Sequence, residues 1–191
     1  MVWLNRSVIE ELRWAAFLLE CSSGIFLLKS TAWNYRPLPT DVLQVYCDAS
    51  GSGLGFWYPS LNLGFQSNLP ECPLVKDIFF YEALCIVSAI HDAVTRLPKN
   101  GRLAVFTDSL NSVYLFNSLS GGPGYNRLLM YVVEVILAFQ VDFRVFHISG
   151  EKNVIADNLS RWRALDARLA SPGLRVLPFQ PPRDTLGAVK K

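Results

Sequence analysis

The sequence predicts an α/β fold, with helices on both faces of a mixed five-stranded sheet, three strands antiparallel and then two parallel. Three observations support this class. Residues 42–66 contain three strand patterns separated by turn residues, and residues 78–97 carry apolar side chains at helical spacing. Residues 103–163 then alternate strand and helix patterns. The expected order of elements is β-β-β-α-β-α-α-β-α.

The composition indicates a folded protein. The 191 residues, 51% of them hydrophobic, suffice for one domain of ordinary size with tails. The net charge of +2 neither indicates nor excludes a nucleic-acid partner, because basic residues can cluster. The four cysteines have no C-x-x-C spacing and no histidine companions, which predicts reduced, buried thiols rather than a zinc site.

The N-terminal region shows no membrane or export pattern. The most apolar run, residues 14–28, contains Glu20 and several polar residues, so it falls short of an uncharged span of about 18 residues. Residues 5–11 lack the basic-then-apolar order of a secretory signal. We therefore expect an intracellular protein with no membrane partner.

Residues 1–40 are expected to form a helix and a linker. The S-x-x-E pattern at residues 7–10 is a capping box and Gly24 is a plausible stop, so the helix is predicted over residues 7–23. Two prolines then interrupt regular structure, which places a domain boundary near residue 40.

The main domain is expected over residues 41–168. Strands are predicted at 42–49, 54–58, 61–66, 103–107 and 143–148. Helices are predicted at 78–97 and 126–140, together with a short helix that is capped by Ser109 or Asn111 and runs through Asn117, and a last helix capped by Asn153. Residues 169–191 contain several prolines and a basic end, so this segment is predicted to be a flexible tail.

One strand delivers an acid into a glycine-rich turn. Asp48 stands near the end of the first strand, beside Gly51, Gly53 and Gly55. We expect the strand to fix the direction of the carboxylate and the glycines to let a bulky anionic substrate approach. Taken alone, Asp48 fits a turn residue better than a ligand.

Three further acids occupy comparable places. Glu82 is early in the first long helix, Asp108 ends the fourth strand, and Asp157 is early in the last helix. If the first and fourth strands are neighbours, Asp48 and Asp108 lie side by side, and the two helices can bring the other acids over them. Close carboxylates raise one another's pKa, and an oxygen-only set suits two Mg²⁺ or Mn²⁺ ions.

Each acid also has a structural interpretation. Glu82 fits the solvated boundary of an amphipathic helix, Asp108 fits a helix cap, and Asp157 fits a favourable charge near a helix N-terminus. Asp77 competes with Glu82 as the functional acid of the first long helix. The four acids together favour the metal site.

Four blocks of sequence resemble the ribonuclease H domain of retroelement reverse transcriptases. They are Y-C-D-A-S-G-S-G-L-G-F-W, F-Y-E-A-L, V-F-T-D-S-L-N-S-V and H-I-S-G-E-K-N-V-I-A-D-N-L-S-R. The last block is the most specific, because Gly150 to Arg161 follow the G-x-x-N-x-x-A-D-x-L-S-R pattern that is typical of retrotransposon polyproteins. The resemblance covers residues 42–163.

The resemblance implies a ribonuclease H-like fold and hydrolysis of the RNA strand of an RNA/DNA hybrid. It implies that the catalytic and metal-binding residues are Asp48, Glu82, Asp108 and Asp157. Residues 1–40 look like the connection to a reverse transcriptase polymerase domain, which the resemblance implies as a partner.

Four polar residues are candidates for contacts with the 2′-hydroxyl and phosphate groups of a hybrid read through its minor groove. They are Ser50, Ser109, Asn111 and Asn153.

Two features depart from the family pattern. The loop at residues 150–152 lacks the histidine that cellular members carry, and residues 121–124 lead directly into an apolar helix where some members have a basic extension. Two alternatives therefore stay open: a catalytically weak or inactive module that binds nucleic acid or acts as a scaffold, and a DNA-directed nuclease of the same fold.

Overall fold

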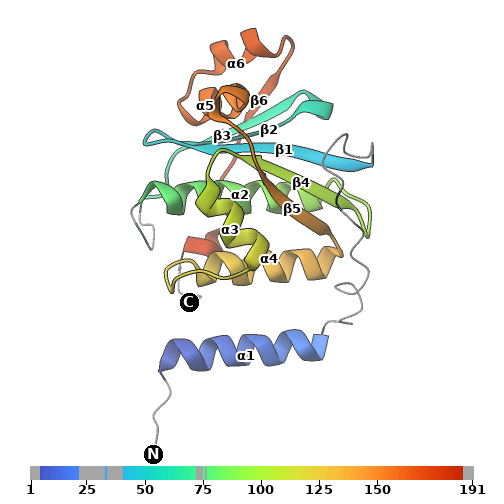
Figure 1. Ribbon diagram of the computed structural model, residues 1–191, viewed down its shortest axis with the longest axis vertical. Coiled ribbons are helices and arrows are strands. Elements are labelled where there is room, and N and C mark those ends of the chain that lie inside the picture. The colour runs from blue at the N-terminus through green and yellow to red at the C-terminus, as the bar shows by residue number, and fades with distance from the viewer. Residues whose placement is uncertain (1–4, 22–32, 34–40, 72–74, 76, 187–191) are drawn as a thin grey trace, which may run out of the picture.

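A computed structural model describes residues 5–21, 33, 41–71, 75 and 77–186, and their strands form one mixed sheet (Figure 1). The strands are β1 (Val42–Ala49), β2 (Leu54–Tyr58), β3 (Leu63–Ser67), β4 (Arg102–Thr107), β5 (Asp142–His147) and β6 (Arg175–Pro178). Their order across the sheet is β5-β4-β1-β2-β3-β6. The β1–β2 and β2–β3 pairs are antiparallel, whereas β1–β4, β4–β5 and β3–β6 are parallel.

The sheet has one strand more than the five that the sequence predicts. The additional strand β6 comes from the segment expected to be a tail, and it pairs with β3 from Leu63–Arg175 to Gln66–Pro178. Pro178 is tolerated because β6 is an edge strand, where a missing N–H leaves no ladder bond unmade. The predicted antiparallel meander and the two parallel strands after it are confirmed.

Helices cover both faces of the sheet, as predicted (Figure 1). They are α1 (Arg6–Cys21), α2 (Ile78–Val94), α3 (Leu110–Ser118), α4 (Asn126–Phe139), α5 (Val154–Ser160) and α6 (Ala164–Ala170). On one face α5 and α6 lie over the strands, while α2 and α3 lie on the opposite face with α4 beyond α2 and α1 beyond α4 (Figure 1). Short 3₁₀ turns are η2 (Pro59–Leu61), η3 (Gly150–Lys152) and η4 (Arg183–Leu186).

Several predicted bounds shift by a few residues. The first helix begins at Arg6 because Asn5, rather than Ser7, caps it: Ser7 N donates to Asn5 Oδ1 at 3.1 Å. The third strand begins at Leu63, because η2 and Asn62, which has a left-handed φ of 46°, lengthen the preceding turn. Residues 22–24, where the first helix was expected to stop, lie outside the described residues.

The main core lies between the sheet and α2. Buried side chains of α2, among them Phe80, Leu84 and Ile86, pack with those of β1, β2, β4 and α4. Cys47 and Cys85 are buried free thiols in this core, as predicted, whereas Cys21 on α1 is exposed. Cys72 lies outside the described residues.

Helix α1 contacts the domain through polar side chains. Trp14 Nε1 donates to Glu134 Oε1 at 2.6 Å, and Asn126 Nδ2 donates to Glu11 Oε1 at 2.9 Å. No residue of α1 is buried. In the described part of the chain, no helix is both long and apolar enough to cross a membrane.

The outer edge of β5 is occupied by a side chain. Asn117, near the end of α3, donates from Nδ2 to Val145 O at 2.8 Å and accepts at Oδ1 from Val145 N at 3.1 Å. The amide of Asn117 thus takes the two hydrogen bonds that a further strand would make at Val145, which protects an edge that could otherwise pair with another chain.

Candidate active site

Asp48 and Asp108 lie at the same edge of the sheet. β1 and β4 are parallel and pair in register at Tyr46 and Phe106, and each acid follows its aromatic residue by two positions. Asp48 is still within β1, whereas Asp108 directly follows the last residue of β4, so both acids lie where these two neighbouring strands end. The sequence prediction that the first and fourth strands are neighbours is confirmed.

Asp157 reaches this edge from α5, which packs over β1 and β2. Its Oδ1 accepts a hydrogen bond from Arg161 Nε at 2.8 Å, one helical turn later. Both Asp157 and Asp108 repel the negative charge of Asp48 and so raise its pKa. Three of the four predicted acids therefore interact electrostatically.

Glu82 approaches from α2, on the other side of the sheet, and is half-buried. Burial raises its pKa; a hydrogen bond with Ser109 opposes this, and the charges of Asp108 and Asp77 add to it. Glu82 is thus linked to the cluster through Asp108. Asp77, the competing acid, instead caps α2 by accepting from Phe80 N at 2.6 Å, a structural role.

The pKa of the Asp48 carboxyl is far above its ordinary value. Burial raises its pKa to about 7; a hydrogen bond from Ser160 lowers it, Asp108 and Asp157 raise it, and Arg161 lowers it. The residue is only 7% exposed. A buried carboxylate with like charges beside it is stabilised by a cation, and the oxygen-only donor set fits Mg²⁺ or Mn²⁺.

The described residues do not form a ready-made metal shell. Among the residues that the structure describes, no three His, Cys, Asp or Glu side chains are close enough to hold a metal ion. The metal role of Asp48, Glu82, Asp108 and Asp157 stays a prediction.

Ser160 belongs to the last sequence block, but its role at the site is not among the sequence predictions. It is fully buried, and its Oγ lies 2.6 Å from Asp48 Oδ2 and 2.9 Å from Asp157 O. A hydroxyl has one proton, so it donates to one acceptor at a time, and the shorter contact is to the carboxylate. Ser50 Oγ in turn donates to Ser160 O at 2.9 Å. The end of α5 is thereby tied to β1 and its turn.

The glycines beside Asp48 have a different role from the one expected. A Cβ at Gly55 would stand 2.5 Å from Ser160 N and 2.8 Å from Ala156 O, and one at Gly53 would stand 2.6 Å from Ser67 O. These two glycines give α5 and β3 room against β2, rather than giving a substrate room. Gly51 alone has open space where a Cβ would be.

Three of the four predicted substrate contacts are engaged within the fold. Ser50 is 5% exposed; Ser109 is 8% exposed and caps α3; and Asn153 is 1% exposed, with Nδ2 donating to Cys47 O at 2.9 Å. Asn153 occupies the cap position of α5, but its side chain makes no cap hydrogen bond there. Asn111 is exposed on α3. Their contact with a substrate stays a prediction.

Comparisons with known proteins give a match only among solved structures. No protein-family model and no curated protein matches the chain. Ribonuclease H1 of the halophilic archaeon Halobacterium salinarum NRC-1 superposes with a TM-score of 0.52 at 16% identity, covering 66% of this chain and 99% of that one. LC11-RNase H1 in complex with an RNA/DNA hybrid gives a TM-score of 0.52 at 18% identity, covering 61% and 92%.

A second structure of LC11-RNase H1, isolated from compost by a metagenomic approach, also has a TM-score of 0.52 at 18% identity, covering 66% of this chain and 98% of that one. At such identities the likeness concerns the fold. The chain therefore has a ribonuclease H-like fold, as the four sequence blocks imply.

Proposed function

We propose that the chain is a metal-dependent endoribonuclease that hydrolyses the RNA strand of RNA/DNA hybrids as part of a retroelement reverse transcriptase. The observation that carries this proposal is the buried carboxylate of Asp48, held by Ser160 between the charges of Asp108 and Asp157. The ribonuclease H-like fold and the four sequence blocks support the choice of substrate. The retroelement setting rests on the blocks alone.

Asp48, Glu82, Asp108 and Asp157 are the residues that would hold the metal ions. When bound, two divalent ions would activate a water molecule and stabilise the oxygen that leaves the phosphodiester. The chain itself orients Asp48 through Ser160, and the Asp157–Arg161 ion pair places a cation beside the acids. Asn111 is the one exposed residue among the four predicted substrate contacts, so its side chain can reach the hybrid most easily.

A polymerase domain as partner is supported by α1. Val8, Leu12 and Leu19 are 39%, 57% and 82% exposed, and they follow one another at spacings of four and seven residues, which puts them on one side of the helix. A helix without buried residues gains little from the domain it touches, so an apolar partner surface over this stripe would stabilise it.

The test is cleavage of an end-labelled RNA/DNA hybrid with Mg²⁺ or Mn²⁺. We expect hydrolysis of the RNA strand only, and a loss of at least about a hundredfold in Asp48→Asn, the scale of losing one preorganised electrostatic contact. Asp166→Asn, which removes an exposed acid on α6, is the matched control and keeps full activity. Equal cleavage by the Asp48→Asn variant and the unsubstituted chain would contradict the proposal.

The second candidate is a module that binds nucleic acid without cutting it. It is favoured by one observation: among the described residues, no group of three or more His, Cys, Asp and Glu side chains is arranged as a metal site in the metal-free chain. Calorimetric titration separates the two: a nuclease binds Mn²⁺, whereas no binding up to millimolar concentrations favours the module. Duplex DNA as a parallel substrate distinguishes a DNA-directed nuclease of this fold.

A further inference from the structure

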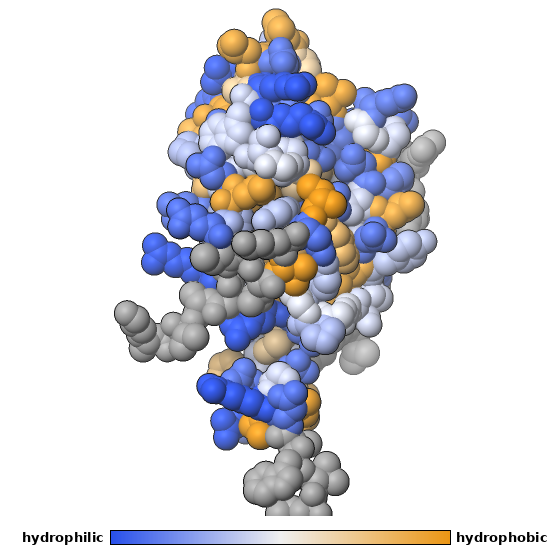
Figure 2. Space-filling view, turned by 90° about the vertical axis from the view of Figure 1, so that its left-hand side faces the viewer, coloured by the Kyte–Doolittle hydropathy of each residue, from blue (hydrophilic) through white to orange (hydrophobic). Residues whose placement is uncertain are grey.

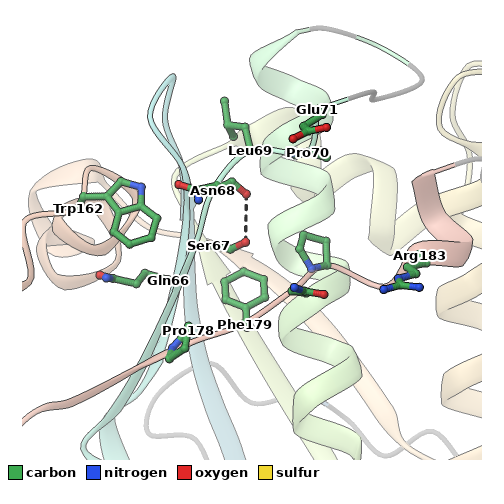
Figure 3. Close-up of a pocket in the computed structure, with 12 residues that line it drawn as sticks. Gln66, Ser67, Asn68, Leu69, Pro70, Glu71, Trp162, Pro178, Phe179 and Arg183 are labelled. Carbon is green, nitrogen blue, oxygen red and sulfur yellow. Dashed lines mark hydrogen bonds between the residues drawn. The ribbon is translucent and has the colours of Figure 1, made fainter.

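A groove of about 650 Å³ lies at the end of β3 (Figure 3). Gln66, Asn68 and Trp162 line it together with Phe179 and Arg183 of the C-terminal segment. Figure 3 shows Trp162 and Gln66 on one side of the strand, with Phe179 and Arg183 on the other. Residues from both sides of the sheet therefore line the groove. Phe179 and Arg183, which form its far wall, belong to the segment that follows β6.

The groove continues the edge on which the candidate active site lies. Asp48 pairs with Gly55, Gly55 pairs with Gln66, and Gln66 pairs with Pro178, so one row crosses from the acid to the groove. Two strand spacings separate Asp48 from Gln66, which is about 10 Å. Figure 2 views the molecule from this side and shows a largely hydrophilic surface with small separate apolar groups.

Trp162, which lines the groove, has an unusual backbone conformation. Its φ is 62°, in the left-handed region that bulky residues rarely adopt. Trp162 is 43% exposed, and its indole Nε1 donates to Ser52 O at 3.1 Å, so the ring is fixed against the hairpin turn. Such strained residues cluster at binding sites.

The chemistry of the lining suits a nucleobase. Its one acid, Glu71, and its one base, Arg183, balance, so the lining carries no net charge. Amides from Gln66, Asn68 and Gln180 offer both donors and acceptors. A half-exposed indole is a stacking surface for any base, while a guanidinium at the far end can contact a phosphate.

We propose that this groove binds the single-stranded extension of a nucleic acid whose duplex part lies at the candidate active site. A base of the extension stacks on Trp162 and hydrogen-bonds to Asn68, and the following phosphate meets Arg183. The proposal rests on the proposed function in one respect, the duplex at the acid edge.

The experiment measures binding by fluorescence anisotropy, with Asp48→Asn introduced throughout so that nothing is cut. The probes are a blunt RNA/DNA hybrid and the same hybrid with a short extension on either strand. We expect one extension to tighten binding at least about fivefold, the lower end of what base stacking contributes. Trp162→Ala and Asn68→Ala should each remove most of that gain while leaving binding of the blunt hybrid within twofold.

Two matched comparisons sharpen the result. Arg183→Ala should reduce the gain, whereas Arg175→Ala, an exposed arginine of β6 outside the groove, should not. Trp162→Phe keeps an aromatic ring and should retain part of the gain. No gain from either extension, or a full gain in both Trp162→Ala and Asn68→Ala, overturns the proposal. Failure of the proposed function appears separately, as an uncut blunt hybrid with the unsubstituted chain.

Discussion

At the scale of single residues, the buried Asp48 couples stability to pH. Its pKa is about 7 in the folded chain and 3.8 as the ordinary value, so between these values the folded state binds more protons than the unfolded state. The free energy of unfolding therefore falls as the pH rises through this window. Above the window, the destabilisation caused by the buried charge of Asp48 is fully present.

We expect Asp48→Asn to stabilise the metal-free protein above pH 7, by on the order of 2–4 kcal/mol relative to its effect at pH 4, because an amide does not ionise. Urea unfolding at both pH values, without divalent cations, measures the difference. Asp166→Asn should show no such pH dependence. An equal effect of Asp48→Asn at both pH values would mean that ionisation of Asp48 does not destabilise the folded protein.

Gly55 should tolerate no side chain. A Cβ there meets backbone atoms of α5 at 2.5 and 2.8 Å, and backbone cannot move aside as a flexible side chain can. We expect Gly55→Ala to cost about 3 kcal/mol. Gly51→Ala, in open space in the turn that precedes β2, should change the free energy of unfolding by less than about 0.5 kcal/mol. If urea titrations gave similar losses of unfolding free energy for both variants, the close packing of α5 against Gly55 would be contradicted.

At the scale of elements, Asn117 should control the edge of β5. Asn117→Ala removes both hydrogen bonds to Val145 and leaves that backbone unpaired, so we expect the amide of Val145 to lose most of its protection against hydrogen exchange. Asn111→Ala, on the same helix, should leave Val145 protected. If the hydrogen-exchange rate of the Val145 amide were unchanged in Asn117→Ala, the hydrogen bonds from Asn117 would not be what protects this edge.

The sequence predicts elements well where the pattern is dense. β1 and β2 have the predicted bounds, because two largely apolar runs flank a turn rich in glycine. β6 is missed because it is four residues long and ends in Pro178, and what stabilises it is the distant edge of β3 rather than its own composition.

The candidate site is predicted only in part, for a similar reason. Strand and helix positions place Asp48 and Asp108 at one edge, since parallel pairing carries both there. Ser160 is a fixed position of the last sequence block, but its contact with Asp48 is not predicted, because a serine in a helix does not reveal which strand lies within hydrogen-bond distance. The sequence predicts that the glycines give a substrate room, whereas Gly53 and Gly55 lie against other parts of the fold, including α5.

At the scale of the whole molecule, the C-terminal segment should matter for stability. Phe179 packs against Phe56 of the main core with ring centroids 4.8 Å apart, and Phe179 N donates to Gln66 O at 3.1 Å. We expect Phe179→Ala to cost about 2 kcal/mol, less than a fully buried phenylalanine would. Arg175→Ala, exposed on the same segment, is the control. A cost below about 0.5 kcal/mol in thermal or urea unfolding would mean that the segment is dispensable.

The hydrogen bond between Ser160 and Asp48 joins residues 112 positions apart. During synthesis a ribosome releases Asp48 long before it releases the serine that orients it, and α5 cannot settle on β2 until then. A nascent chain, or a chain that ends early at a premature stop codon, therefore contains Asp48 without the serine that donates a hydrogen bond to it. The order of translation itself delays any activity of this edge until nearly the whole domain has been made.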